Sequence, residues 1–315
     1  MYEKNIPILD DESSDFEYKE EIKKFPNYDS TYIFNGLVKY RRDCIEKAYE
    51  ISSRFLDENF KEQIKIQGNF HSRLWELQLC SILISKGYKL IIPPKIKKQL
   101  ARPDFCIILD NGSKIWIEAV CPQLGRLDKK PEIIPGQIYT RSSNIKDELH
   151  LSAPRIISST LAKFQKLDLY KNNPDFGTND KFIIAINTEL IDHHEPANMA
   201  KELVLYGMGL QYIKQTGESG RYFHEEITID NDNKKVTVPT ALFHKKDYSH
   251  ISAVMSSNCW FDFGGNFIED MAQRVNTYIN HNGTNPLNHE TINFGTRHEM
   301  VCNGEHCTLK HHSST

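Results

Sequence analysis

Two short apolar runs, Phe105 to Leu109 and Ile115 to Val120, constrain the fold most strongly, because Asn111-Gly112 lies between them. Asn-Gly between apolar runs is the strongest short-range signal for a tight β-hairpin. Paired strands lie about 5 Å apart. Asp104 directly precedes the first run and Glu118 lies within the second. The sequence therefore predicts a hairpin whose two carboxylates face each other across the ladder.

Helices and strands are expected on both sides of this hairpin. Apolar residues at helical spacing predict a helix over residues 69–85, with Glu76 in its interior, followed by a strand over 88–92. Beyond the hairpin, Pro154 is expected to open a helix that ends at Tyr170, and residues 181–186 form a buried strand. The order helix, three strands, helix, strand predicts an α/β (α+β) fold in which helices flank a mixed central sheet.

The remaining sequence is expected to add to this core at both ends. Residues 1–30 are acidic and weakly patterned, which is typical of a flexible arm, and 31–68 are expected to contribute a packing helix from about Tyr32 to Lys65. The core then spans 69–187, and 188–315 form a C-terminal extension packed on it. Within that extension, strands are expected at Glu225–Ile229, Lys235–Val238 and Ile251–Met255.

The composition indicates an ordinary globular protein. At 315 residues the chain is long enough for one elaborated domain, and its formal charge of -3 gives no overall attraction to nucleic acid. No apolar run reaches the roughly 18 residues of a membrane span, and Met1 to Asn5 lack the features of a signal peptide. The 7 cysteines are an odd number. Several adjoin apolar runs, which favours reduced thiols and a cytoplasmic location.

Three carboxylates occupy successive elements of the predicted core. Glu76 lies on the first helix, Pro103-Asp104 at the second strand and Glu118 on the third. Over about residues 69–187 this pattern resembles the PD-(D/E)XK superfamily of restriction-endonuclease-like nucleases. The resemblance implies that Asp104 and Glu118 bind magnesium, for which manganese can substitute, and that Glu76 completes the shell or orients a bound water. It also implies metal-dependent hydrolysis of a phosphodiester, with DNA as the expected substrate.

The chain departs from the family pattern two residues after Glu118, where Val120 replaces the expected lysine. Valine cannot stabilise a developing negative charge. Within the resemblance, a lysine on the following helix can replace it, and Lys166 is preferred over Lys163, whereas Lys114 lies too far along its strand. The alternative is a catalytically silent member of the same fold that binds nucleic acid or protein. An unrelated α/β protein with coincidental carboxylates is the third reading.

Basic residues border the predicted site. Lys97, Lys98 and Arg102 precede the hairpin, and Arg155 lies at the expected start of the following helix, where it is suited to bidentate phosphate binding. Charge runs of this kind supply salt-dependent affinity for nucleic acid, although most are solvated loops. These four residues are therefore the predicted nucleic-acid contacts. A self-symmetric duplex target would favour a homodimer.

The C-terminal tail contains a group of potential zinc ligands: Cys302, His306, Cys307, His311 and His312. Sulfur and imidazole are the ligands that zinc prefers. Their spacing matches no compact zinc module, and a polar tail accommodates histidines without a metal. The tail is therefore interpreted either as a zinc site or, more simply, as a solvated histidine-rich end.

Overall fold

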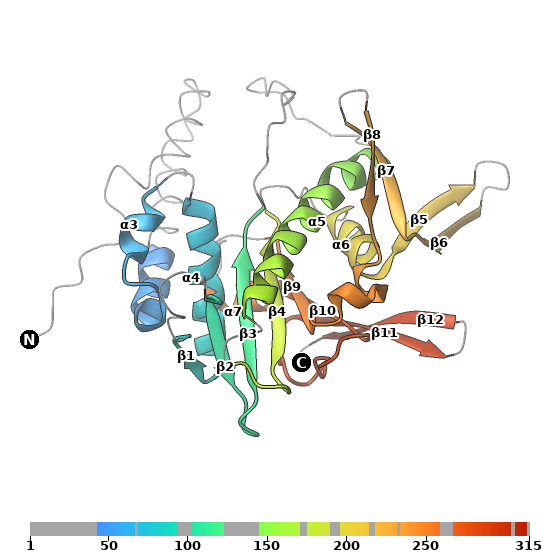
Figure 1. The fold of residues 1–315 in the computed structure, drawn as a ribbon. Helices are drawn as coiled ribbons and strands as arrows, with labels where there is room; N and C mark the ends of the chain where they lie inside the picture. Colours follow the sequence, from blue (N-terminus) through green and yellow to red (C-terminus); the bar gives the residue numbers. More distant parts are fainter. Residues whose placement is uncertain are drawn as a thin grey trace, which may run out of the picture.

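The computed structural model describes residues 43–66, 69–93, 102–122, 145–170, 175–189, 196–213, 218–231, 234–258, 267–303 and 306–313. Within these residues, eight strands form one mixed sheet in the order β1-β2-β3-β4-β9-β10-β11-β12, with helices on both faces (Figure 1). The predicted mixed α/β class, with a central sheet flanked by helices, is confirmed.

The sheet contains β1 (Leu90–Ile91), β2 (Phe105–Ile108), β3 (Lys114–Val120), β4 (Lys181–Asn187), β9 (Ala253–Ser257), β10 (Asn276–Ile279), β11 (Thr296–Asn303) and β12 (His306–Ser313). Three pairs, β3–β4, β4–β9 and β10–β11, are parallel, and the other four are antiparallel. Two separate hairpins are formed by β5 (Met208–Ile213) with β6 (Glu218–Phe223) and by β7 (Glu226–Asn231) with β8 (Lys234–Pro239). The strands predicted at Glu225–Ile229 and Lys235–Val238 are thus confirmed, and they pair as a hairpin.

The hairpin of β2 and β3 forms where the Asn-Gly signal predicted it. Gly112 has a φ of +79°, which only glycine adopts without strain, and its amide donates to the Leu109 carbonyl at 2.9 Å. The Asn111 side chain accepts hydrogen bonds from the amide and hydroxyl of Ser113. Phe105 pairs with Ile117, so Asp104 and Glu118 lie at the same end of the ladder.

Two hydrophobic cores cover the two faces of the sheet. One core packs under α3 (Phe60–Ile64), α4 (Phe70–Ser85) and α7 (Phe267–Gln273), and the other under α5 (Ile145–Tyr170) and α6 (Pro196–Tyr206). Alternation along β3 sends Ile115 and Ile117 to the first core and Trp116 to the second. Glu118 therefore lies on the α5 face, in line with Trp116.

Two predicted helices have different bounds in the structure. The helix expected to begin at Pro154 begins at Ile145, so Pro154 lies inside α5. Ala153 and Ile156 are buried against the sheet, and this packing outweighs the hydrogen bond that proline removes. The single helix expected to reach Lys65 is also wrong. Helical residues end near 52, and a 3-10 turn, η2 (Ser53–Phe55), follows. Leu56 is extended with a ψ of 166°, so the helix does not continue through it.

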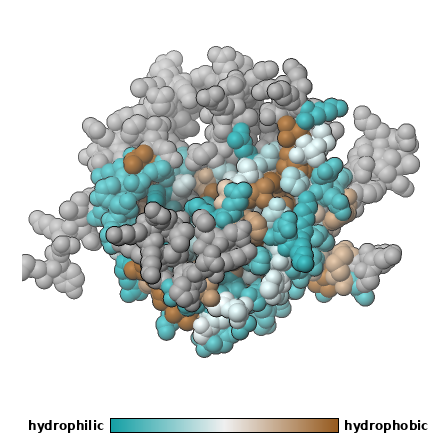
Figure 2. Space-filling view, in the orientation of Figure 1, coloured by the Kyte–Doolittle hydropathy of each residue, from teal (hydrophilic) through white to brown (hydrophobic). Residues whose placement is uncertain are grey.

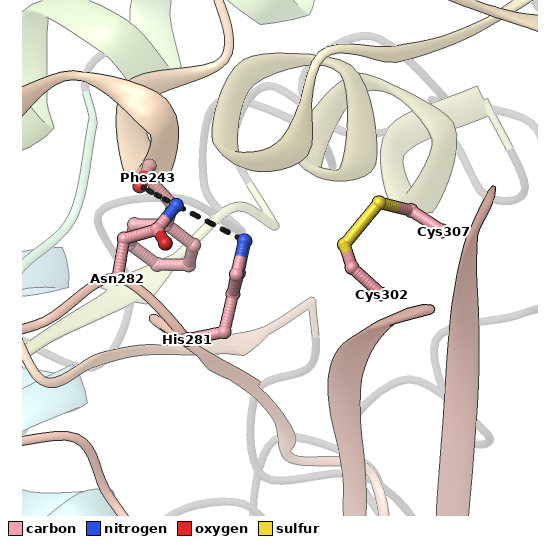
Figure 3. The surroundings of a disulfide bond; sticks show 5 residues. All are labelled: Phe243, His281, Asn282, Cys302 and Cys307. Atoms are coloured by element: carbon pink, nitrogen blue, oxygen red, sulfur yellow. Dashed lines mark hydrogen bonds between the residues drawn. A yellow bond between two sulfur atoms is a disulfide. The ribbon is translucent and has the colours of Figure 1, made fainter. Parts of the chain in front are cut away.

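The C-terminal residues continue the same sheet rather than forming a separate layer. β9 pairs with β4, and β10 to β12 extend the sheet from there. The hairpin of β11 and β12 places Cys302 directly opposite Cys307, with 4.0 Å between their Cα atoms, and a disulfide joins the two strands (Figure 3). This disulfide was not predicted. The reduced thiols expected beside apolar runs are confirmed at Cys80, Cys106 and Cys121, which are buried and outside any disulfide.

Hydrophilic residues predominate on the described surface in the orientation of Figure 2, with small groups of hydrophobic residues between them. Among the described residues, the exposed large hydrophobic side chains are scattered along the chain at Ile66, Ile92, Phe223 and Val236. Among the described helices, none combines the length and the apolar character needed to cross a bilayer.

Candidate functional site

Glu118 is the centre of a buried charged cluster between β3 and α5. Its side chain is 1% exposed, and its Oε1 accepts hydrogen bonds from the Nζ atoms of Lys163 and Lys166, each at 3.0 Å. The Tyr170 hydroxyl donates to Oε2 at 3.3 Å. Residues 163, 166 and 170 share one face of a helix because they are three and four apart. The sequence of α5 therefore presents two ammonium groups and a hydroxyl to one carboxylate.

Asp104 lies immediately before β2 and is held against β3. Its Oδ2 accepts a hydrogen bond from the Ala119 amide at 2.6 Å. Burial raises the pKa of the Asp104 carboxyl well above 3.8, and the charges of Glu118 and Glu76 raise the pKa further, against the opposing effects of Lys163 and the Ala119 amide. Burial and the neighbouring carboxylates therefore favour the protonated form of Asp104.

Glu76 approaches the same place from α4, on the other side of the sheet. Its Oε2 accepts a hydrogen bond from Arg73, one turn earlier on the helix, at 2.6 Å. Burial raises the pKa of Glu76, although the charge of Arg73 opposes this rise. Arg73 also pairs with Asp57 at 3.3 Å. Glu76 is therefore a partly buried carboxylate, with 13% of its side chain exposed, that is stabilised by a neighbouring guanidinium.

A pocket opens between Glu76 and Asp104, with Asp57, Arg102, Phe55 and Phe105 among its lining residues. Arg102 forms an ion pair with Asp57 and donates to the Pro93 carbonyl at 3.1 Å. Its guanidinium is thus already engaged by protein groups at the pocket. Carboxylates from three elements and one arginine face this space.

Of the other predicted nucleic-acid contacts, the structure describes only Arg155. Lys97 and Lys98 lie outside the described residues. Arg155 is half-buried about ten residues into α5, because the helix begins at Ile145, so the expected position at a helix start is wrong. Arg155 was expected to bind phosphate beside a helix N-terminus, and no N-terminus lies at this position.

The three lysines considered as replacements for the one missing at Val120 have different surroundings in the structure. Lys163 and Lys166 both contact Glu118, and Lys163 is more deeply buried, with 16% of its side chain exposed against 40% for Lys166. Lys114 instead donates to the Asp175 carbonyl at 2.9 Å and lies over the Trp116 ring. Burial alone would lower the pKa of Lys163, but the charges of Glu118 and Asp104 outweigh it and raise the pKa. Lys163 therefore remains an ammonium.

Three residues of this cluster were not predicted as site residues. Tyr170 shares the helix face of Lys163, and Arg73 lies three residues before Glu76, so helical spacing contained a signal for both. Asp57 reaches the site from the turn after η2. No local pattern indicates it, because only the tertiary fold brings it to Arg73 and Arg102.

The donor atoms at this site are carboxylate oxygens, which suit a hard cation such as magnesium. The three carboxylates are not preassembled into a tight triad. Among the described residues, one group of three potential ligands has all its ligand atoms within 4.8 Å of one another, and it is His289, Glu299 and His312, far from this site in the sheet. Comparison with protein-family models, curated proteins and solved structures finds no match to this chain.

Proposed function

We propose that this protein is a metal-dependent phosphodiester hydrolase, a nuclease acting on DNA, built on a restriction-endonuclease-like core. The observation that carries the proposal is the contact of Lys163 and Lys166 with the buried Glu118. Val120 leaves the expected lysine position without a charge, and α5 supplies two lysines beside the same carboxylate. This arrangement supports a relocated lysine. Lys163 is favoured over Lys166 because Lys163 is more deeply buried.

Asp104 and Glu118 would hold magnesium through their oxygens, and Glu76 would complete the shell or orient a water. Bound magnesium supplies Lewis-acid polarisation of the phosphoryl oxygen and a lowered pKa for a bound water. In the metal-free protein the charges of Glu118 and Asp104 raise the pKa of Lys163 and favour its ammonium form. Lys163 would therefore stabilise the negative charge that develops on the phosphate rather than accept a proton.

A catalytically silent binding protein of the same fold is the second candidate. Its support is specific: Glu118 already makes two ion pairs and a contact with Tyr170, and the three carboxylates are not gathered as tightly as a preformed metal triad. In that case the lysines neutralise Glu118 permanently, and the cluster stabilises the fold. The two functions predict the same contacts but opposite responses to magnesium.

A cleavage assay separates them. Plasmid and single-stranded DNA are incubated with the protein and magnesium or manganese, beside Asp104→Ala and Glu118→Ala. Asp110→Ala is the matched control, because Asp110 is an exposed carboxylate at the turn of the same hairpin. Metal-dependent cutting that both site variants lose and the control retains supports the hydrolase. Cutting that persists in both site variants rejects the site, and no cutting on any substrate favours the binding protein.

A second series tests the relocated lysine. Lys163→Met and Lys166→Met each remove one ammonium from Glu118, and Lys114→Met removes a lysine at the far end of β3. We expect Lys163→Met to lower the cleavage rate most, by on the order of 10²-fold, the scale of losing one preorganised charge-stabilising group. Lys114→Met should cleave normally. Equal losses in all three variants would contradict the role of α5.

A further inference from the structure

A second group of metal-ligand side chains lies at the opposite end of the sheet. His289, Glu299 and His312 each offer one ligand atom, and these atoms lie within 4.8 Å of one another. His289 precedes β11, Glu299 lies on β11 and His312 lies on β12. The group therefore joins a connecting segment to both strands of the terminal hairpin.

Strand register explains how these residues meet. Arg297 pairs with His312 across the hairpin, and Glu299 is two residues farther along β11, so Glu299 and His312 are diagonal neighbours on one face. His312 Nε2 lies 3.3 Å from Glu299 Oε2. The His289 and His312 rings are stacked, with centroids 4.6 Å apart and an interplanar angle of 16°.

The nitrogen that faces this group is available for a ligand. His312 Nε2 is buried and has no hydrogen-bond partner among the described residues, although Glu299 lies beside it. A tetrahedral ion with bonds of about 2.0 Å has ligand atoms about 3.3 Å apart, which is the observed separation of these two atoms. The stacked His289 ring would have to rotate out of the stack so that its nitrogen points at the same ion as His312 Nε2 and completes a set of three ligands.

We propose that His289, Glu299 and His312 bind a zinc ion, with a fourth position open to water. Two imidazoles and one carboxylate form a donor set that zinc accepts, whereas magnesium prefers an all-oxygen shell. The site shares only His312 with the group of tail residues for which zinc was one of two interpretations. There, the Cys302 and Cys307 sulfurs are joined, and His311 contacts His298 through their Nδ1 atoms at 2.9 Å.

Two positively charged side chains lie beside the group and oppose its negative charge. Lys310 is paired with Glu299 across the ladder and is exposed to solvent, and Arg297, opposite His312, donates to the Gly295 carbonyl at 3.0 Å. Glu299 is the negatively charged member of the group and offsets part of the charge of a bound divalent ion. Zinc would brace the segment that carries His289 against the terminal hairpin and stabilise that end of the sheet.

The test is zinc titration of the full chain by calorimetry, with millimolar magnesium present and without reductant. We expect one zinc per chain. His289→Ala, His312→Ala and Glu299→Gln should each weaken zinc binding at least about tenfold, since losing a supporting residue outside the coordination shell already costs about that much. His311→Ala is the matched control, because it removes a histidine from the other face of the same strand. It should leave the affinity unchanged.

Three results would overturn the zinc site. The first is wild-type protein that binds zinc no more tightly than the His289→Ala variant. The second is His311→Ala weakening zinc as much as His289→Ala does. The third is loss of zinc in a Cys302→Ser/Cys307→Ser double variant while the three site variants still bind it. Circular dichroism of each metal-free variant verifies folding, and an Asp104→Ala/Glu118→Ala background, which should retain zinc, separates this site from the carboxylates.

Discussion

The two ends of the eight-stranded sheet carry two chemically different polar sites. At β2 and β3 the groups are carboxylates on three elements, and the central one, Glu118, is buried and already paired with lysines. At β11 and β12 the group is two imidazoles and one carboxylate, all half-buried, and His312 Nε2 has no hydrogen-bond partner among the described residues. The first site is neutralised by the protein, whereas the second is open to an added ion.

This difference shows what each site requires of the fold. A buried carboxylate is costly unless it is paired, so the first site needs α4 and α5 on opposite faces of the sheet to supply Arg73 and Lys163. The second site is half-exposed, and the register of one hairpin plus the preceding segment assembles it. The carboxylate site is therefore expected to depend on the global fold, and the histidine site on local structure.

Removing Glu118 should have the largest effect on stability. Glu118→Ala leaves Lys163 buried without its carboxylate, and breaking a buried pair from one side costs about 3–5 kcal/mol. Urea denaturation of wild type and variant measures this loss, with Asp110→Ala as the control. Glu118→Leu/Lys163→Met should recover part of it, because the unpaired charge is gone. A loss below about 1 kcal/mol would mean that water solvates the pair.

The second-largest expected effect is the change in thermal stability on adding metal, which should differ between the two ends of the sheet. A ligand present at a hundred times its dissociation constant stabilises the folded state by about 2.7 kcal/mol. We expect zinc to raise the Tm of Asp104→Ala but not of His289→Ala, and magnesium to do the reverse. Differential scanning fluorimetry at matched saturation measures both shifts. If magnesium still raised the Tm of Asp104→Ala, magnesium would not be bound at the carboxylate site.

The Asp104 carboxyl should show its burial as a pH dependence. Its pKa is raised well above 3.8 in the folded protein, so its contribution to stability is full below pH 3.8 and is lost as the pH rises through the folded pKa. Asp104→Asn keeps an acceptor for the Ala119 amide and carries no charge. The variant should be more stable than wild type at neutral pH, by about 0.5–2 kcal/mol.

The acidic range is the control for this prediction. Below pH 3.8 the wild-type carboxyl is protonated in both the folded and the unfolded chain, so the advantage of Asp104→Asn should disappear there. Denaturation midpoints measured across the pH range test the slope. A constant difference between variant and wild type at every pH would show that the charge of Asp104 is not the cause.

Local patterns predicted the parts of the candidate site that depend on short spacing. Asn111-Gly112 fixed the hairpin, and helical periodicity placed Glu76 on α4 and Lys163 and Lys166 on one face of α5. The roles of these residues in metal binding and catalysis stay predictions. The expected start of α5 at Pro154 was wrong, because packing of the buried residues around it overrides a local proline preference.

Partners that meet only through tertiary structure were not predictable. Asp57 reaches Arg73 and Arg102 across 16 and 45 residues. The terminal hairpin also carries a local signal, since Asn303-Gly304 repeats the Asn-Gly dipeptide of the first hairpin. Strand alternation around that turn would have placed His311 and His312 on opposite faces, and so in different groups.

Substitution of Asp57 should have the smallest effect on stability, because Asp57 lies at the exposed edge of the buried cluster. Its side chain is 39% exposed, and it pairs with Arg73 and Arg102 at the pocket. Exposed ion pairs contribute about 0.2–1 kcal/mol and are screened by salt. Asp57→Asn should therefore lower stability by less than about 1 kcal/mol, and the difference should shrink in high salt, whereas the loss in Glu118→Ala should persist. If Asp57→Asn instead matched Glu118→Ala and ignored salt, the buried cluster would extend to the pocket mouth, and Arg102 would belong to its interior rather than to a surface that contacts phosphates.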